Sequence, residues 1–292
     1  MKFTRGFALL AATAVIALGA GACSSSDTDS AGTTKAPPSS EAPASTDAPA
    51  KKLTILVSND DGYAAPGIDA VVQALAALPD TEIVVSAPAT QQSGMGSKVT
   101  EGELTATDEK TKSGHDAHAV VGTPADSVNW ALDGGIDVKP DLVVAGINQG
   151  QNLGMIGDKA SGTIGAARAA VAHGIPALAA SMGIHSVDGE DAADYTLAAT
   201  YVVKWVEERR ADILDGKLAG DAPLIENMNI PSCNDGGEIR GVAEVTLADT
   251  ADGALLPDQN CKSTIAQPAD DITAFNNGFV AISPVPAQPP AA

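Results

Sequence analysis

The sequence predicts an α/β protein built on a doubly wound, mostly parallel sheet, and three observations lead to this fold class. Short apolar runs that suit buried parallel strands, such as residues 53–57 and 141–147, recur along the chain. Stretches of helical periodicity alternate with them. Repeated strand–helix units of this kind imply right-handed crossovers and a parallel sheet. About 240 residues follow the first fifty, which is enough for one large α/β domain.

The first strand–helix unit carries the most informative motif. The apolar run Leu53–Val57 ends at the polar segment 59–62 (Asn-Asp-Asp-Gly), and Pro66 opens an apolar-periodic stretch that we expect to be helical. Open α/β sheets place their ligands at the carboxyl ends of their strands. Adjacent carboxylates at such a place favour a divalent cation, because these ions take oxygen ligands. The alternative is an ordinary turn, since Asn, Asp and Gly all favour turns.

The middle of the chain continues the alternation. A strand at 82–87 leads into a loop at 89–96, and residues 97–121 alternate without helical periodicity, which predicts an irregular hairpin. Thr123 is a good N-cap, with Pro124 at the first helical position. The further expected elements are a helix to Leu132, a strand at 141–148, a glycine-rich loop at 150–162, a helix at 163–173, a strand at 175–181 and a helix at 195–213.

The C-terminal part breaks this alternation. Residues 224–230 are strand-like, turns and polar stretches follow, and a final apolar run covers 279–282. We expect this C-terminal extension to extend the sheet or to pack on a partner. Cys233 and Cys261 lie within it, and two such thiols in an exported protein are expected to form a disulfide.

The first residues have the features of a secretory signal. Lys2 and Arg5 precede an apolar stretch at 7–18, and small residues then lead to Cys23. The apolar stretch is shorter than the ~20 residues that a membrane-spanning helix needs. A cysteine in this position resembles the lipobox of bacterial lipoproteins, in which that residue is lipidated and becomes the mature N-terminus. Secretion with an unlipidated Cys23 is the alternative.

This segment sets the expected domain organisation and location. Residues 24–50 are rich in Ser, Thr, Ala, Pro and Asp and hold no aromatic residue, so they cannot bury a core. We expect an exported, extracytoplasmic protein held at the bacterial cell membrane by a lipid anchor. The predicted parts are a signal peptide at 1–22, a disordered tether at 23–51 and one folded domain at 52–292.

The strongly acidic composition limits the classes of partner. The chain has 37 Asp and Glu residues against 17 Lys and Arg residues. A protein that binds the nucleic-acid backbone needs basic patches, so nucleic acid is not an expected partner. A small anionic substrate stays compatible with this charge if a metal ion reverses the local sign at the site.

Polar residues that follow different strands are expected to meet at one edge of the sheet. Asp60 and Asp61 follow the first strand, Ser93 lies in the loop after the second, and Asn148 ends a later strand. Their carboxylate, hydroxyl and amide oxygens suit Mg²⁺, Mn²⁺ or Ca²⁺. The segment 161–163 (Ser-Gly-Thr) begins a predicted helix, where free N–H groups and the helix dipole favour a phosphate. A hard cation beside a phosphate site suits phosphate-ester hydrolysis.

Seven motifs follow one another along the chain: 58–68 (Ser-Asn-Asp-Asp-Gly-Tyr-Ala-Ala-Pro-Gly-Ile), 87–94, 122–128, 140–154, 160–167, 227–231 and 278–284. These motifs, in this order, make the chain similar to the SurE family of survival-protein nucleotidases. The family is one of Rossmann-like, metal-dependent phosphatases of nucleoside monophosphates. The chain departs from the family pattern at a few positions. Ser127 stands where the family usually has Cys, and Ala169 stands where an acidic residue is often found. Gln91 and Gln92 stand where basic or Asn residues are common.

The resemblance implies a role for each motif residue. Asp60, Asp61, Ser93 and Asn148 would bind the divalent cation, and the two aspartates would also be catalytic. Residues that would line the phosphate or substrate side are Asn59, Asn152, Ser161, Gly162 and Thr163.

The leading functional hypothesis is therefore a divalent-metal-dependent phosphomonoesterase that hydrolyses nucleoside 5'- or 3'-monophosphates. A homo-oligomer is compatible with this hypothesis. The nucleophile is either a water that the cation positions or one of the aspartates. The alternative is an extracytoplasmic binding lipoprotein for nucleotides or phosphate esters that has kept the fold and lost turnover. The paired aspartates with Ser93 and Asn148 favour the enzyme, because a binding module does not need this ligand set.

Overall fold

The computed structural model describes residues 51–255 and 259–289 of the 292-residue chain. The predicted signal peptide at 1–22, the predicted lipidation site Cys23 and all but the last residue of the predicted tether at 23–51 lie outside the described residues. Within the described ranges, no helix is both long enough and apolar enough to cross a membrane.

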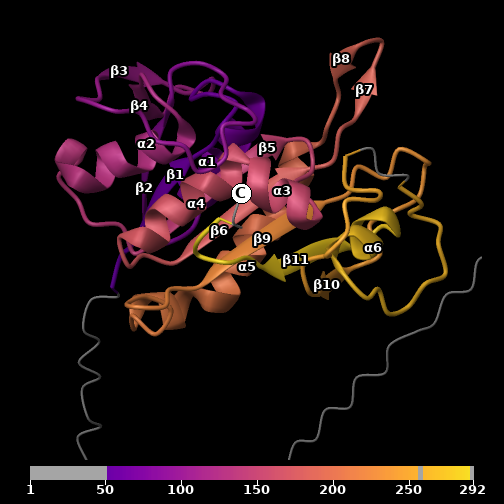
Figure 1. Ribbon diagram of the computed structural model, residues 1–292. Helices are drawn as coiled ribbons and strands as arrows, with labels where there is room; N and C mark the ends of the chain where they lie inside the picture. The colour runs from indigo at the N-terminus through magenta and orange to yellow at the C-terminus, as the bar shows by residue number, and fades with distance from the viewer. Residues whose placement is uncertain (1–50, 256–258, 290–292) are drawn as a thin grey trace, which may run out of the picture. The chain divides into compact units, whose positions relative to one another are not determined.

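The core of the domain is a nine-stranded sheet with the order β10-β11-β9-β6-β5-β1-β2-β4-β3 (Figure 1). Its central pairs are parallel, as the sequence predicts, and β1 lies between β2 and β5, with Val57 opposite both Val85 and Val144. Only β3 against β4 and β11 against β9 are antiparallel in this sheet. The parallel strands are β1 (Leu53–Ser58), β2 (Thr81–Pro88), β4 (Asp116–Val120), β5 (Leu142–Gln149), β6 (Ala177–Met182) and β9 (Ile225–Ile230).

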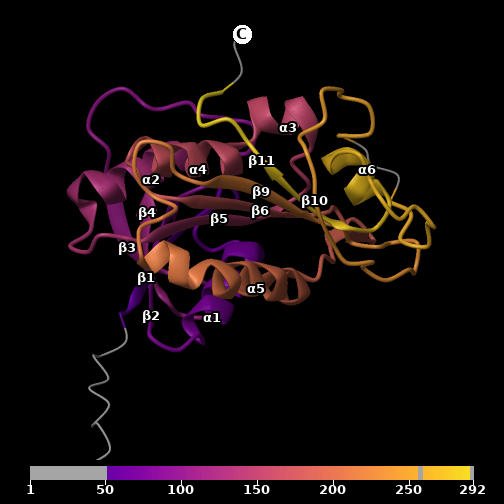
Figure 2. The same ribbon diagram turned by 90° about the horizontal axis from the view of Figure 1, so that it is seen from below.

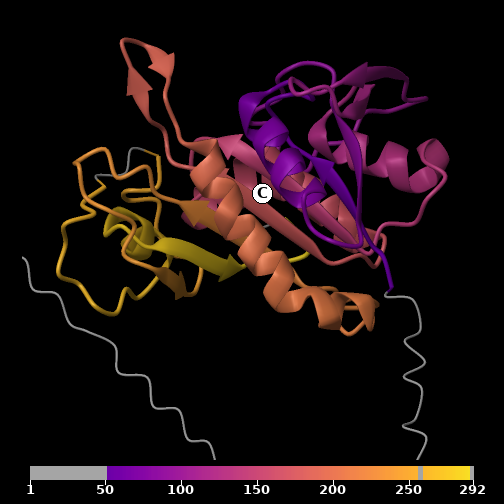
Figure 3. The same ribbon diagram turned by 180° about the vertical axis from the view of Figure 1, so that it is seen from behind.

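Helices cover both faces of the sheet, which gives three layers (Figure 2). Helices α1 (Pro66–Ala76) and α5 (Tyr195–Leu214) cover one face, where Trp205 and the apolar side of α1 are buried against the strands. Helices α2 (Pro124–Trp130) and α4 (Gly162–Ala172) cover the other. Figure 3 shows α5 crossing its face beside α1. Because both faces are covered, the central strands are apolar along their length, which explains their continuous apolar runs.

Local sequence signals fix where the helices begin. Thr123 caps α2 in a capping box: its side chain accepts a hydrogen bond from the Asp126 N–H, and Asp126 accepts one from the Thr123 N–H. The Ser161 hydroxyl accepts from the Ile164 N–H and so caps α4. The predicted hairpin at 97–121 is present as β3 (Ala106–Lys110) and β4, and a π-helical turn (Ala131–Gly135) extends α2.

Two segments between β5 and α5 differ from the prediction. The segment predicted as a glycine-rich loop contains helix α3 (Gly154–Ala160), whose glycines disfavour a helix in isolation. Tertiary contacts stabilise it: Arg168 on α4 forms a buried ion pair with Asp158 and donates a further hydrogen bond of 2.6 Å to the Asp158 carbonyl. A short hairpin of β7 (Ser186–Val187) and β8 (Glu190–Asp191), which was not predicted, extends away from the sheet (Figure 1).

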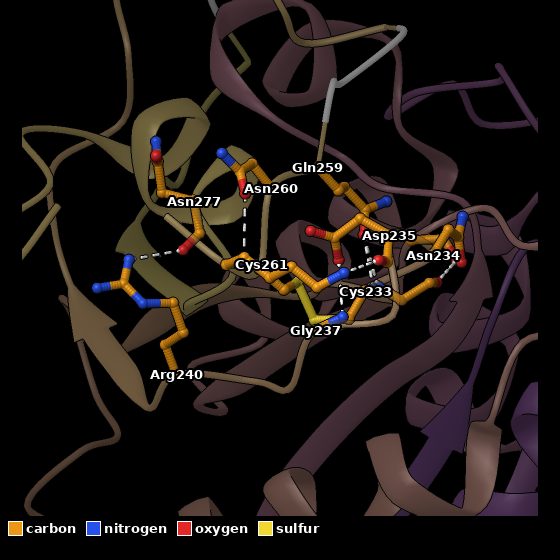
Figure 4. Close-up of a disulfide and its surroundings, with 12 residues drawn as sticks. Cys233, Asn234, Asp235, Gly237, Arg240, Gln259, Asn260, Cys261 and Asn277 are labelled. Atoms are coloured by element: carbon orange, nitrogen blue, oxygen red, sulfur yellow. Dashed lines mark hydrogen bonds between the residues drawn. A yellow bond between two sulfur atoms is a disulfide. The ribbon is translucent and has the colours of Figure 1, made fainter. Parts of the chain in front are cut away.

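The C-terminal extension both enlarges the sheet and forms a separate cluster. Strand β11 (Val280–Pro284) pairs antiparallel with β9, which confirms that this part extends the sheet, and β10 (Val242–Glu244) adds to the edge. We call residues 231–255 and 259–279 the C-terminal lobe; it also contains α6 (Asp271–Asn276) and a small core around Phe275. As predicted, Cys233 and Cys261 form a disulfide, with 5.4 Å between their Cα atoms (Figure 4).

Candidate active site

A cavity of about 270 Å³ opens at the carboxyl ends of β1 and β5, where an open α/β sheet is expected to bind its ligand. The loops after these strands, the N-terminus of α4 and helix α3 form its walls, and the C-terminal lobe closes one side. The structure brings five of the predicted site residues to this cavity: Asp60, Ser93, Asn148, Asn152 and Ser161.

Asp60 is buried at the end of β1 and held by the start of α4. Its Oδ1 accepts a hydrogen bond of 2.8 Å from the Thr163 hydroxyl. Gly162 packs against it so closely that a Cβ on Gly162 would lie 2.8 Å from the Asp60 Cβ, so a side chain there would displace the carboxylate. Burial raises the pKa of the Asp60 carboxyl, and the hydrogen bond from Thr163 opposes this rise.

Asp61 is less buried than Asp60 and faces a neighbouring hollow that Gln91 and Gln149 help to line. Its Oδ2 accepts a hydrogen bond of 2.9 Å from the backbone N–H of Gln149, which ties the end of β1 to the end of β5. Burial, and then the adjacent Asp60 charge, raise the pKa of Asp61 to about 7. The two adjacent carboxyl groups therefore oppose full ionisation unless a positive charge lies beside them.

Asn148 has an amide oxygen without a hydrogen-bond partner. Its Nδ2 donates to the Gly150 carbonyl at 2.5 Å, which fixes the orientation of the amide. Its Oδ1 is buried and is one of only a few such side-chain atoms without a partner in the described part of the chain. An unsatisfied buried acceptor at a cavity wall is costly unless a ligand pairs with it.

Ser93 approaches the cavity from the loop after β2. Its hydroxyl accepts a hydrogen bond of 2.6 Å from Nε2 of Gln91, and its N–H donates to Oε1 of Gln91 at 3.2 Å. Ser93 is exposed, so Gln91 is the contact that restrains it. Sequence reasoning noted Gln91 only as a departure from the family pattern and did not assign this supporting role.

These four residues have the chemistry of a cation site. They offer carboxylate, hydroxyl and amide oxygens, which suit a hard divalent ion. The raised pKa values of the aspartates and the unpaired Asn148 Oδ1 are both features that a bound cation would relieve. The described residues contain no cluster of three or more His, Cys, Asp or Glu side chains, so a softer or all-charged metal site is absent from them.

Asn152 is held rigidly beside this set by residues that the sequence analysis did not assign. Its Nδ2 donates to the Ser181 and Thr163 hydroxyls at 2.9 and 3.2 Å. Its backbone N–H donates to Asn229 Oδ1, and its carbonyl accepts from the side chains of both Asn227 and Asn229. The motif at 227–231 could have indicated that its asparagines hold another site residue, because buried asparagines on a strand need hydrogen-bond partners.

Two predicted substrate contacts have other roles in the structure. The amide of Asn59 is fully buried and bonds both the N–H and the carbonyl of Gly62 at 3.1 Å, so it shapes the loop that carries the aspartates. Thr163 is also fully buried, and its hydroxyl is shared between Asp60 and Asn152. These hydrogen bonds position the neighbouring site residues, and a direct contact of Asn59 or Thr163 with the substrate stays a prediction.

The fold and the cavity together define a doubly wound α/β protein with an oxygen-rich site at the carboxyl ends of its strands, beside a helix N-terminus. The family model "Survival protein SurE" matches residues 55–252. The chain belongs to the SurE family.

Individual relatives agree with this assignment. The protein named "5'-nucleotidase SurE" from Methanothermobacter thermautotrophicus is 41% identical over 194 residues, which cover 64% of this chain and 71% of that protein. A protein of the same name from Methanocella arvoryzae is 40% identical over 186 residues, which cover 61% of this chain and 66% of that one. The crystal structure of the SurE protein from Aquifex aeolicus has a TM-score of 0.61 at 28% identity and covers 80% of this chain and 94% of that chain.

Proposed function

We propose that the chain is a phosphomonoesterase that hydrolyses nucleoside monophosphates with the help of a divalent cation. Membership of the SurE family and similarity to proteins named 5'-nucleotidase support a hydrolase acting on nucleoside monophosphates. The observation that carries the proposal is that the cavity joins the oxygen donors of Asp60, Ser93 and Asn148 to the N-terminus of α4. A cation and a phosphate can therefore bind side by side.

Asp60, Asp61, Ser93 and Asn148 would hold the cation, which we propose to be Mg²⁺, Mn²⁺ or Ca²⁺. A cation bound there would polarise the phosphate and neutralise the charge that develops on its oxygens. Thr163 keeps Asp60 oriented toward this position through its 2.8 Å hydrogen bond. The nucleophile is either a water beside the aspartates or one of the aspartate carboxylates.

The phosphate side of the cavity would be formed by Asn152, Ser161 and the N-terminal end of α4. Gly162 allows the helix to start directly against Asp60, so the N-terminal end of the helix dipole and the aspartates lie close together. This juxtaposition lets the protein bind an anion despite a net charge of −20. Assays with different nucleotides determine which base and which phosphate position, 5' or 3', the enzyme prefers.

The test is hydrolysis of adenosine 5'-monophosphate and of an aryl phosphate, with Mn²⁺ and with EDTA. Chelation and Asp61→Asn should each remove nearly all activity, whereas Ser93→Ala should have a smaller effect, because a neutral oxygen contributes less to cation binding than a charge. Asp221→Asn is the matched control, since Asp221 is exposed in the loop that precedes β9. Unchanged activity in EDTA or in Asp61→Asn would end the metal-phosphatase proposal.

The alternative of a binding lipoprotein without turnover finds no support among the relatives, which are named as nucleotidases. Export and a lipid anchor on Cys23 are a separate proposal that rests on the sequence features of residues 1–23. We also propose that the chain is divided into a signal, a tether and a folded part, and that it assembles into a homo-oligomer.

A further inference from the structure

We propose that Leu255 of the C-terminal lobe and Ile184, which follows β6, form an apolar wall that binds the nucleobase of the substrate. The inference rests on the proposed function and names the part of the same cavity that would recognise the nucleoside. Leu255 lies just beyond residues 55–252, which the family model matches.

The residues that line the cavity include a polar set and several apolar side chains. Asp60, Asn148, Asn152 and Ser161 are the polar set, which would hold the cation and the phosphate. The apolar side chains include Ile156, Ile184, Ala254 and Leu255. Because both groups line one cavity, a phosphate ester held by the polar set would share the cavity with these apolar side chains.

Ile184 and Leu255 are unusually accessible for their type. Their exposed fractions are 51% and 62%, although an apolar side chain of this size is usually buried. Exposed apolar side chains that share one cavity mark a binding surface more often than single ones scattered over a protein do. A planar base could cover both side chains and leave its polar edge in water.

The wall lies close to the polar set of residues. Ile184 lies against Gly150: a Cβ added to Gly150 would be 3.5 Å from Cγ1 of Ile184. Gly150 in turn follows Asn148 by only two residues. Gln151 links the two parts of the wall: its Nε2 donates to the Leu255 carbonyl at 3.0 Å, and its Oε1 accepts from the Ile184 N–H at 3.5 Å. The Gln151 amide therefore holds the two parts of the wall together.

The C-terminal lobe packs tightly against the rest of the domain. A Cβ on Gly154, the first residue of α3, would lie 2.8 Å from the Thr250 carbonyl oxygen. A Cβ on Gly183, next to Ile184, would lie 2.8 Å from the Phe275 ring. Asp271 of the lobe accepts hydrogen bonds of 2.8 Å from the N–H groups of Gly154 and Ala248. These contacts make the lobe a fixed wall of the cavity.

The experiment compares a substrate with a base and one without. Kinetic constants for adenosine 5'-monophosphate and for glycerol 2-phosphate are measured with Mn²⁺ for Ile184→Ala, Leu255→Ala and the double variant. Loss of about two or three methylene contacts with the base should raise KM for the nucleotide roughly fivefold to tenfold in each single variant. The kcat for the nucleotide and the KM for glycerol 2-phosphate should stay within about twofold, because a uniform binding contact is lost.

Two exposed apolar residues outside the cavity provide matched controls. Val187 on the neighbouring hairpin is 53% exposed and Ile265 in the lobe is 40% exposed, so Val187→Ala and Ile265→Ala should leave both substrates unaffected. Equal increases in KM for both esters, or an unchanged KM for the nucleotide in the double variant, would overturn the proposed wall.

Binding of unphosphorylated adenosine, followed by calorimetry, separates this inference from the proposed function. Weaker adenosine binding in the double variant than in the wild type supports the wall, even if no ester is hydrolysed and the proposed function fails. Equal binding of adenosine by both proteins, or no binding by the wild type, counts against the wall whatever the phosphatase assay shows.

Discussion

The hydroxyl of Thr163 donates a 2.8 Å hydrogen bond to Oδ1 of Asp60 and connects the first turn of α4 to the end of β1. The same hydroxyl accepts from Asn152, so one buried side chain fixes both the cation side and the phosphate side of the cavity. The geometry of the site therefore depends on this buried residue as well as on the residues that line the cavity.

Replacing Thr163 should test this relationship. Thr163→Val keeps the shape but removes the hydroxyl, so Asp60 and Asn152 each lose a buried hydrogen-bond partner. We expect kcat/KM for a nucleoside monophosphate to fall on the order of tenfold, which corresponds to about 1–2 kcal/mol for one misplaced buried contact. Thr163→Ser, which keeps the hydroxyl, should retain most activity. Equal activity of Thr163→Val and the wild type at saturating Mn²⁺ would contradict the positioning role.

The raised pKa of Asp61 should make the metal-free protein less stable as the pH rises. Its pKa is raised from 3.8 to about 7, so between these values the folded state holds a proton that the unfolded chain has released. The unfolding free energy should therefore fall from pH 4 to about pH 7 in EDTA and then stop falling from this cause. Urea denaturation at pH 5 and pH 8 measures the effect.

Asp61→Asn is the control for this titration, because an amide does not ionise at either pH. The unfolding free energy of the variant should fall less than that of the wild type between pH 5 and pH 8. Saturating Mn²⁺ should make this pH-dependent fall smaller in the wild type. A wild-type protein that gains stability relative to Asp61→Asn over this range would show that burial does not raise the pKa.

The disulfide between Cys233 and Cys261 should stabilise the C-terminal lobe. It joins residues 28 positions apart, and a closed loop of this length corresponds to about 3–4 kcal/mol in the chain-entropy account. Cys233→Ala with Cys261→Ala should lower the denaturation midpoint and expose residues near 255 to limited proteolysis first. A double variant with an unchanged midpoint would indicate that packing alone, including that of Phe275, holds the lobe.

Cys23 should be the lipid-modified first residue of the mature protein. The apolar stretch at 7–18 and the small residues before Cys23 are the reason for this prediction. Mass spectrometry of the exported protein checks it, and membrane attachment should disappear in Cys23→Ala. An unmodified Cys23, or cleavage elsewhere, would show that the segment is not a lipoprotein signal.

Much of the fold could be predicted because its information is local. The apolar run Leu53–Val57, the cap at Thr123 and the alternation of strands with helices all depend on neighbouring residues. Helix α3 could not be predicted in this way, since its glycines disfavour a helix and the buried Arg168–Asp158 pair stabilises it from another element. The β7–β8 hairpin is too short to produce a periodic signal.

The candidate site shows the same division. Asp60, Ser93 and Asn148 could be predicted to meet because parallel strands end at one edge of the sheet. The use of each side chain could not be predicted, because Asn59 and Asn152 have the same chemistry and differ only in their partners. The wall formed by Leu255 also depends on where the C-terminal lobe packs, which no local pattern specifies.

The contacts that build the cavity join distant parts of the chain, and this has a consequence for how the site forms during folding. Thr163 is 103 residues from Asp60, and the contacts between Gly154 and Asp271 and between Gln151 and Leu255 span 117 and 104 residues. Closures of this length are slow compared with forming a single helix. A growing chain that already contains Asp60 and Asp61 thus has no assembled cavity. The ability to bind substrate should emerge only after α6 has docked, as one of the last events of folding.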